Sequence, residues 1–188
     1  MLFSSAAQSQ EREDEEDGSS VGEVSLSNDT LQFRYITGAD RVADDSRASV
    51  TLFLSESRDI VVSADLLFPG RLDIDRLQIG FGPRMYAALL EDENQDILAL
   101  SLGVDLRYEL ERRTGLAIAG QAFYAPDILT FGSADNLTDL SARVEIRLQP
   151  QLTVFGGMRW FEFDLTPGFG EGTRTLQEEL FVGVGWRF

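Results

Sequence analysis

Apolar and polar residues alternate along most of the chain from Val21 onward, and this period of two predicts β-strands. Between Leu98 and Tyr108, for example, every second residue is large and apolar, and the intervening face includes serine, glycine, aspartate and arginine. Eight further segments have the same two-faced pattern. They cover residues 30–37, 48–55, 60–68, 77–89, 116–124, 140–148, 152–160 and 180–188.

Short connections separate these segments, and a parallel partner would require a crossover of a dozen or more residues. Stretches such as "SESRD", "EDENQD" and "TPGFGEGTRT" carry the residues typical of turns and loops. The sequence therefore predicts an all-β fold, an antiparallel up-and-down barrel of eight to ten strands. A bacterial membrane barrel requires an even number of strands. We favour ten, with residues 21–33 forming two short strands around Asn28 and Asp29; eight would result if one segment lay outside the wall.

Alternation alone leaves open which face of the sheet points inward. In a soluble lipocalin-like barrel the apolar face lines the interior, whereas in an outer-membrane barrel it contacts lipid and polar groups fill the lumen. Opposite charges lie two residues apart on single strands, which suits ion pairs across a narrow lumen; a charged, solvent-facing sheet surface is the alternative. The side chains predicted to form a charge network in the lumen are Arg84, Asp105, Arg107, Glu109, Arg143, Glu145, Arg147, Arg159 and Arg187.

Glycines and aromatic residues also favour the membrane orientation. Glycine recurs on the polar face, where a small barrel needs room, at positions 80, 82, 103, 157, 183 and 185. Aromatic residues lie near strand ends, as in interfacial girdles. They are Tyr35, Tyr108, Tyr124, Trp160, Phe161 and Trp186. Pro83 cannot donate a ladder hydrogen bond, so we expect a β-bulge or a strand end near Gly82 and Pro83.

The chain stops on a two-faced strand, "LFVGVGWRF", whose last residue is aromatic. Such a terminal series resembles the C-terminal signature of Gram-negative outer-membrane proteins, which their assembly machinery recognises. A soluble strand has no reason to place an aromatic residue at the carboxyl terminus. The predicted assembly signature consists of Leu180, Val182, Val184, Trp186 and Phe188.

Composition narrows the function further. The formal net charge is −16, so a nucleic-acid partner is not expected. All 16 basic residues are arginine. Residues 1–20 contain the acidic run "EREDEEDGSS" and are predicted to be a flexible tail, within which residues 1–7 resemble the end of a secretory signal. Residues 21–188 are predicted to form one barrel domain.

The sequence contains no histidine, cysteine or lysine. A serine nucleophile would therefore lack its usual base, and we expect no enzyme activity. Catalysis by carboxylate groups alone is the one alternative left open. We also expect no cofactor. The acidic cluster of Asp92, Glu93, Asn94 and Asp96 offers oxygen ligands for Ca²⁺ but lacks the spacing of a calcium loop, so a solvated loop is the favoured interpretation.

Two stretches, "FYAPDILTFGSADNLTDLSARVEIRL" and "VFGGMRWFEFDL", resemble the corresponding part of the YfaZ family of small outer-membrane proteins. The resemblance is clearest over about Leu98 to Phe188 and weak before Thr30. It implies an outer-membrane barrel and brings no catalytic motif or site residue.

These observations predict a small barrel in the outer membrane of a Gram-negative bacterium, with a largely occluded, charge-lined lumen and a structural or interaction role at the cell envelope. Two alternatives stay open: a narrow channel for small solutes, and a soluble barrel that binds an apolar ligand. The expected partners are outer-membrane lipids, lipopolysaccharide and, through the C-terminal strand, the barrel-assembly machinery.

Overall fold

A computed structural model describes residues 20–70, 74–90, 95–111, 113–165 and 172–188. The signal remnant, the predicted tail up to residue 19, and Asp92, Glu93 and Asn94 of the acidic cluster lie outside these residues, whereas Ser20, the last residue of the predicted tail, is described. The described elements are β1 (Val21–Leu26), β2 (Thr30–Gly38), β3 (Arg47–Ser55), β4 (Ile60–Gly70), β5 (Leu77–Leu90), β6 (Gln95–Glu111), β7 (Leu116–Ala125), the 3-10 helix η1 (Asp127–Leu129), β8 (Thr130–Gly132), β9 (Ala134–Arg147), β10 (Leu152–Leu165) and β11 (Thr173–Arg187).

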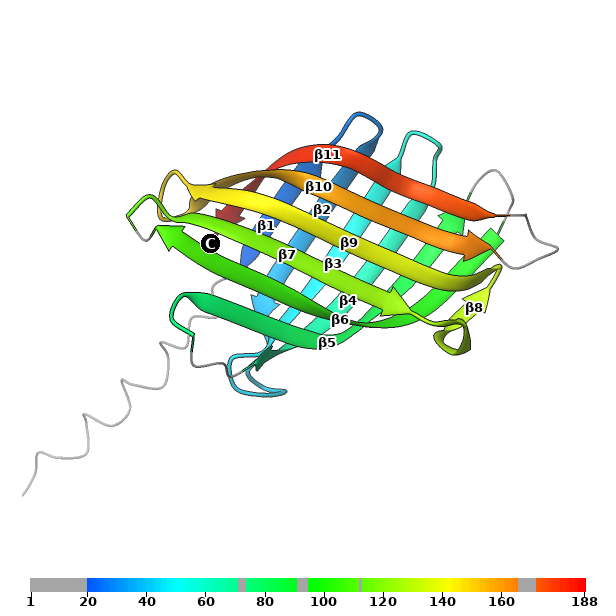
Figure 1. Cartoon of the computed structure of the whole chain (residues 1–188), viewed down its shortest axis with the longest axis horizontal. Helices are drawn as coiled ribbons and strands as arrows, with labels where there is room; N and C mark the ends of the chain where they lie inside the picture. Colours follow the sequence, from blue (N-terminus) through cyan, green and yellow to red (C-terminus); the bar gives the residue numbers. More distant parts are fainter. Residues whose placement is uncertain (1–19, 71–73, 91–94, 112, 166–171) are drawn as a thin grey trace, which may run out of the picture.

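The strands form one antiparallel sheet that closes on itself (Figure 1). Each long strand pairs with the next along the chain, β1 pairs with β11, and β7 pairs with β9. Of the 11 strands in the sheet, the three-residue β8 pairs only with Ile97–Ala99 at the start of β6, beyond the β7 pairing. The remaining ten strands make the wall, which confirms the predicted up-and-down barrel and its favoured strand number.

The tenth strand arises where the sequence predicts it. Residues 21–33 divide into β1 and the first part of β2, joined by a turn at residues 27–29 that a Ser27 to Thr30 backbone hydrogen bond of 2.9 Å closes. Other boundaries differ from the prediction, most of all at the starts of β9 and β11. The interval between the predicted segments 116–124 and 140–148 holds η1, β8 and the start of β9, and β11 begins at Thr173 instead of residue 180.

The expectation of a bulge or strand end at Gly82 and Pro83 is wrong. Strand β5 continues through both residues, and β4 and β5 keep one register on either side of them. Only two pairs are missing from the ladder between β4 and β5, at Leu66 and Leu67 of β4. The gap lies opposite Pro83, which has no N–H to donate. Gly82 permits a close approach of the two strands, since a Cβ atom there would overlap the Leu66 carbonyl oxygen.

The outer face of the barrel is apolar, whereas the inner face carries buried charged and hydroxyl side chains beside a cluster of apolar ones. Large apolar side chains exposed on the outside include Leu102 at 63% and Leu180 at 74% of their maximal area. Side chains buried on the inner face of the wall include Asp65, Arg84, Asp139 and other charged or hydroxyl residues. This is the orientation of a membrane barrel, as predicted, and not the apolar-lined interior of a lipocalin-like protein.

Exposed aromatic residues lie near both ends of the strands. Tyr35, Tyr108 and Trp186 lie toward the end of the barrel where Ser20 and Phe188 meet, here called the terminal end. Tyr124 and Trp160 lie toward the opposite end, here called the far end. Phe161 is the exception to the prediction. Its ring is fully buried inside the lumen, because it follows Trp160 directly and so points to the other face of β10.

Among the described residues, none belongs to a helix long and apolar enough to cross a membrane.

Candidate functional site

The lumen is the candidate site, and Asp139 on β9 is its most connected group. The side chain of Asp139 is fully buried. Arg159 donates to it from Nε and Nη2, each at 2.9 Å, and Arg84 donates from Nη1 at 3.2 Å. The Tyr86 hydroxyl donates a fourth hydrogen bond of 2.8 Å. A buried carboxylate is stabilised only when its charge and lone pairs are matched, and these contacts match both.

Asp65 on β4 is the second buried carboxylate of the same level. It accepts hydrogen bonds from Arg84 Nε at 3.1 Å and from the Ser49 hydroxyl at 2.5 Å. Arg34 lies near it, with Nη2 3.7 Å from Oδ2. Arg84 therefore bridges the two carboxylates across the barrel. We call Arg34, Asp65, Arg84, Asp139 and Arg159 the central ionic layer.

Aromatic rings and amides complete the packing around these arginines. The Arg84 guanidinium lies 3.7 Å from the centre of the Phe123 ring, and the Arg159 guanidinium lies 4.6 Å from the centre of the Phe161 ring. Arg84 also donates to the Gln121 side chain at 3.1 Å. Cations over aromatic faces gain electrostatic stabilisation, most of all where water is excluded. Arg84 and Arg159 are thereby fixed in position as well as charge-paired.

An apolar cluster, here called the aromatic plug, fills the lumen between the central ionic layer and the far end. Phe161 is at its centre, with ring centroids 5.7 Å from Phe53, 5.7 Å from Tyr86 and 5.4 Å from Phe163. All four rings are at most 2% exposed. The other buried members are Val61, Ala88, Leu90, Ile97, Ala99, Ala125, Ala134, Leu137 and Leu176.

A second set of ion pairs occupies the terminal side of the lumen. Arg143 donates to both carboxylate oxygens of Glu23, at 2.9 and 3.0 Å, and to Glu145 at 2.8 Å. Arg107 donates to Glu145 and to Glu109, each at 2.9 Å. Glu145 thus joins β6 to β9, while the Glu23 pair joins β9 to β1 across the barrel. With Arg47 and Asp105, which pair at 2.9 Å, these residues form the terminal ionic layer.

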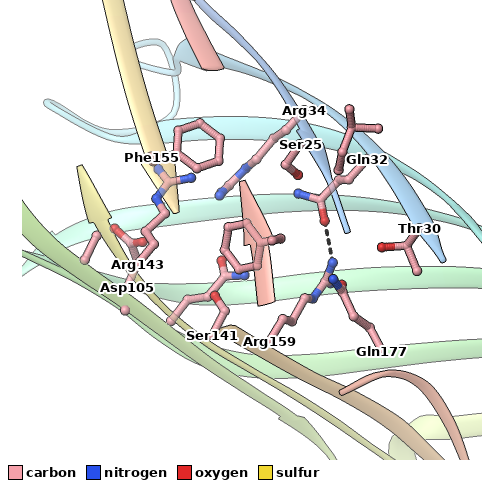
Figure 2. Close-up of a pocket in the computed structure, with 15 residues that line it drawn as sticks. Ser25, Thr30, Gln32, Arg34, Asp105, Ser141, Arg143, Phe155, Arg159 and Gln177 are labelled. Carbon is pink, nitrogen blue, oxygen red and sulfur yellow. Dashed lines mark hydrogen bonds between the residues drawn. The ribbon is translucent and has the colours of Figure 1, made fainter. Parts of the chain in front are cut away.

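The open space of the lumen is unequally distributed. At the terminal end a vestibule of about 500 Å³ lies beside the terminal ionic layer, and its walls include Arg147 and Arg187. Farther inside, two polar cavities of about 40 Å³ each have Arg34 and Arg143 in their walls. Figure 2 shows one of them, with arginine, glutamine and serine side chains from several strands around it. The lumen narrows steeply from its terminal mouth to its middle.

Seven of the nine residues predicted for the charge network lie in the two ionic layers: Arg84, Asp105, Arg107, Glu109, Arg143, Glu145 and Arg159. The other two lie elsewhere. Arg147 and Arg187 are exposed at the vestibule, and within the described part of the chain they have no ion-pair partner. They occupy the last inward positions of β9 and β11, at the rim of the lumen.

Several residues of the network were not among the predicted ones. They are Glu23, Arg34, Arg47, Asp65, Tyr86 and Asp139. Most of them could have been identified as a single charged residue within an otherwise apolar strand, as Asp65 is in "IVVSADLLF". No spacing rule reveals their partners, because the paired residues are up to 120 positions apart in sequence.

The five residues of the predicted assembly signature all lie on the outer face of β11 or at its end. Their exposure ranges from 48% for Val184 to 74% for Leu180. Phe188 stacks on Tyr35 of β2, with ring centroids 6.2 Å apart. Its backbone exchanges two hydrogen bonds with Ser20, at 3.0 and 3.1 Å. The terminal residue therefore also helps to close the barrel at the β1 and β11 seam.

The described residues include no cluster of three or more acidic, histidine or cysteine side chains arranged to hold a metal ion. The Asp92 to Asn94 part of the acidic stretch lies outside them, while Asp96 is exposed on β6.

Three proteins of known structure are similar to this chain at low identity. The KdgM porin, solved in complex with disordered oligogalacturonate, has a TM-score of 0.46 and 10% identity, over 90% of this chain and 99% of that one. The NanC porin has a TM-score of 0.42 and 13% identity, over 91% of this chain and 98% of that one. The outer-membrane channel DcaP of Acinetobacter baumannii has a TM-score of 0.41 and 8% identity, over 88% of this chain and 54% of that one.

No curated protein matches the sequence. The family described as YfaZ precursor matches residues 71–188, which is more than half of the chain. This region contains both stretches that resemble the family in sequence, and it covers β5 to β11 of the barrel. The chain therefore belongs to the YfaZ family, as its sequence indicates, and its fold is a closed antiparallel barrel with a wall of ten strands.

Proposed function

We propose that this protein resides in the outer membrane of a Gram-negative bacterium as a barrel with a closed lumen, and that its role at the cell envelope is structural or interactive. The apolar outer face supports the membrane location, because such a surface would be costly in water. Outer-membrane lipids and lipopolysaccharide are the proposed contacts of this face. The barrel-assembly machinery is the proposed partner of the C-terminal strand.

One observation carries the proposal of a closed lumen. The central ionic layer and the aromatic plug follow one another along the barrel, and their central members, Asp139, Phe161 and Phe163, have no exposed surface. A barrel of eight strands is just wide enough for side chains to fill it, and ten strands enlarge the interior only moderately. Removing the plug should therefore be needed before solutes can pass.

Liposome swelling tests this proposal. Vesicles that contain the wild-type protein should swell in small sugars no faster than empty vesicles. The double variant Phe161→Ala and Phe163→Ala should accelerate swelling, since it removes two rings from the plug. The matched control is Phe81→Ala together with Phe131→Ala, which removes two rings exposed on the outer face, at 52% and 58%. Rapid swelling with wild-type protein would overturn the proposal.

A narrow channel is the second candidate function, and one feature favours it. A bulge in β11 turns both Leu176 and Gln177 inward, where they are buried. Gln177 lines the inner cavity of Figure 2 and also a cavity of about 430 Å³ at the far end. If the Gln177 side chain moves, water can connect these two cavities. Conduction of ions without passage of sugars in wild-type protein would favour this candidate.

We also propose that the protein is not an enzyme. The sequence offers no histidine, cysteine or lysine as base or nucleophile. The buried carboxylates Asp65 and Asp139 are each committed to arginine partners, which is a structural arrangement. Hydrolysis of acyl or glycosidic model substrates by the purified protein, lost on Asp139→Asn with folding intact, would contradict this view.

A further inference from the structure

Arg34 on β2 has fewer partners than the other arginines of the inner lumen. Its Nε donates to the Ser49 hydroxyl at 3.1 Å. Its nearest carboxylate oxygen, on Asp65, is 3.7 Å from Nη2, which is too long for a hydrogen bond. Nη1 and Nη2 thus donate to no residue that the structure describes, although only 11% of the side chain is exposed.

The carboxylates around Arg34 are already engaged. Asp65 accepts from Arg84 and from Ser49. Glu23 lies directly opposite Arg34 in the β1 and β2 pairing, but both of its oxygens accept from Arg143. The central ionic layer therefore contains three arginines and two aspartates. A buried guanidinium with an incomplete counter-charge is unfavourable unless something else supplies the charge.

The space beside Arg34 is suited to a small ligand. Arg34 lies in the walls of both polar cavities, each of about 40 Å³, so each has room for about two or three water-sized particles. One cavity is also lined by Arg143 and Arg159, which Figure 2 shows approaching it from different strands. The amide and hydroxyl groups in its wall are those of Ser25, Thr30, Gln32, Gln121, Ser141 and Gln177.

A negative group also borders both cavities. Asp105 lies in their common wall, but its carboxylate pairs with Arg47 at 2.9 Å. Arg47, Arg107 and Arg143 line both the outer of the two cavities and the vestibule. An anion that enters from the terminal end would therefore meet arginines along the whole route to Arg34.

We propose that Arg34 binds a small anion of about halide size in these cavities. The anion accepts hydrogen bonds from Nη1 and Nη2 of Arg34, which donate to no described residue, and the neighbouring amides and hydroxyls donate further hydrogen bonds to it. The size of the cavities excludes a sugar acid or a nucleotide. The site is independent of whether the lumen conducts, since binding requires access only from the vestibule.

Diffraction from crystals grown in sodium bromide tests the site on wild-type protein. We expect an anomalous peak within hydrogen-bonding distance of the Arg34 guanidinium. Water at this position, with bromide found only at exposed arginines such as Arg147, would overturn the proposal.

Unfolding in detergent provides a second, solution test. Urea midpoints of wild-type protein should rise with increasing sodium chloride, compared with sodium gluconate at the same concentration, because a ligand that binds only the folded state stabilises it. Arg34→Gln should lose most of this chloride-specific shift. Arg147→Gln, which removes an exposed arginine at the vestibule, should retain it. Equal midpoints of the wild-type protein in the two salts would count against the site, and if Arg34→Gln does not fold, the bromide experiment decides.

Discussion

Arg159 and Asp139 form a two-pronged ion pair inside the barrel, with Nε donating to Oδ1 and Nη2 to Oδ2, each at 2.9 Å. The two residues belong to the neighbouring strands β10 and β9, and neither side chain is more than 7% exposed. Parallel hydrogen bonds of this kind fix geometry as well as charge. Because Asp139 also holds Arg84 and Tyr86, we expect its loss to disturb the lumen more than that of any other single carboxylate.

Asp139→Asn should lower the free energy of unfolding by about 3 to 5 kcal/mol, because it leaves two buried arginines without part of their counter-charge. Urea unfolding of the refolded protein in lipid vesicles, followed by tryptophan fluorescence, measures this change. Asp44→Asn is the control, since that carboxylate is exposed in the connection between β2 and β3. Equal stability of the two variants would show that the network contributes little.

Gly157→Ala should destabilise the barrel by about 1 to 3 kcal/mol through overpacking. Gly157 faces the lumen, and a Cβ atom there would overlap the Ala142 carbonyl oxygen and approach the Arg143 side chain. The adjacent Gly156 faces outward, and the nearest atom to its added Cβ is 3.5 Å away. Gly156→Ala should therefore be tolerated in the same unfolding assay. If both variants were equally stable, the inward glycine would not be needed for space.

Phe188→Ala should reduce the amount of folded protein in the outer membrane more than it reduces refolding in detergent. The reason is the proposed recognition of the terminal aromatic by the assembly machinery, in addition to its stacking on Tyr35. Tyr35→Ala removes the same stacking while keeping the terminal residue. Heat-modified mobility on gels reports the folded fraction in both settings. Matching losses for the two variants in cells would attribute the effect to stacking alone.

Asp29, in the turn between β1 and β2, gives a pH-dependent prediction. A hydrogen bond with Glu179 and repulsion by the same carboxylate raise the pKa of Asp29 above its usual range. The folded state therefore holds this proton more tightly, so the related stabilisation is present at acid pH and is lost as pH rises through the raised pKa. Asp29→Asn should raise the urea midpoint at pH 7 and have less effect near pH 4. A gain that is independent of pH would contradict this assignment.

The fold was predictable from the sequence because the alternation of apolar and polar residues in a strand can be recognised from neighbouring positions alone. The charges and glycines on one face of strands such as β6 and β9 also indicated which face points inward. The break at Asn28 and Asp29 gave the tenth strand. Pro83 was misread, because the sheet tolerates a missing donor there by omitting two pairs from one ladder while keeping its register.

The site was less predictable, because its contacts connect distant strands. Glu23 and Arg143 are 120 residues apart, and only the closed barrel brings them together. Phe161 was expected at the membrane interface, but the strict alternation of β10 directs it into the aromatic plug. The placement of Arg147 and Arg187 at the vestibule depends on where β9 and β11 end, and strand ends are the boundaries that alternation defines least well.

Single-channel recording in planar bilayers tests the closed lumen most directly. Purified wild-type protein, inserted into the bilayer, should give no stable conductance steps at moderate voltage, because the central ionic layer and the aromatic plug leave only small separate cavities between the vestibule and the far end. The Phe161→Ala and Phe163→Ala double variant, recorded in parallel, should give measurable leak and so prove that insertion occurs. Large, steady steps from the wild-type protein at every insertion would contradict the account and show that the charged residues line an open pore.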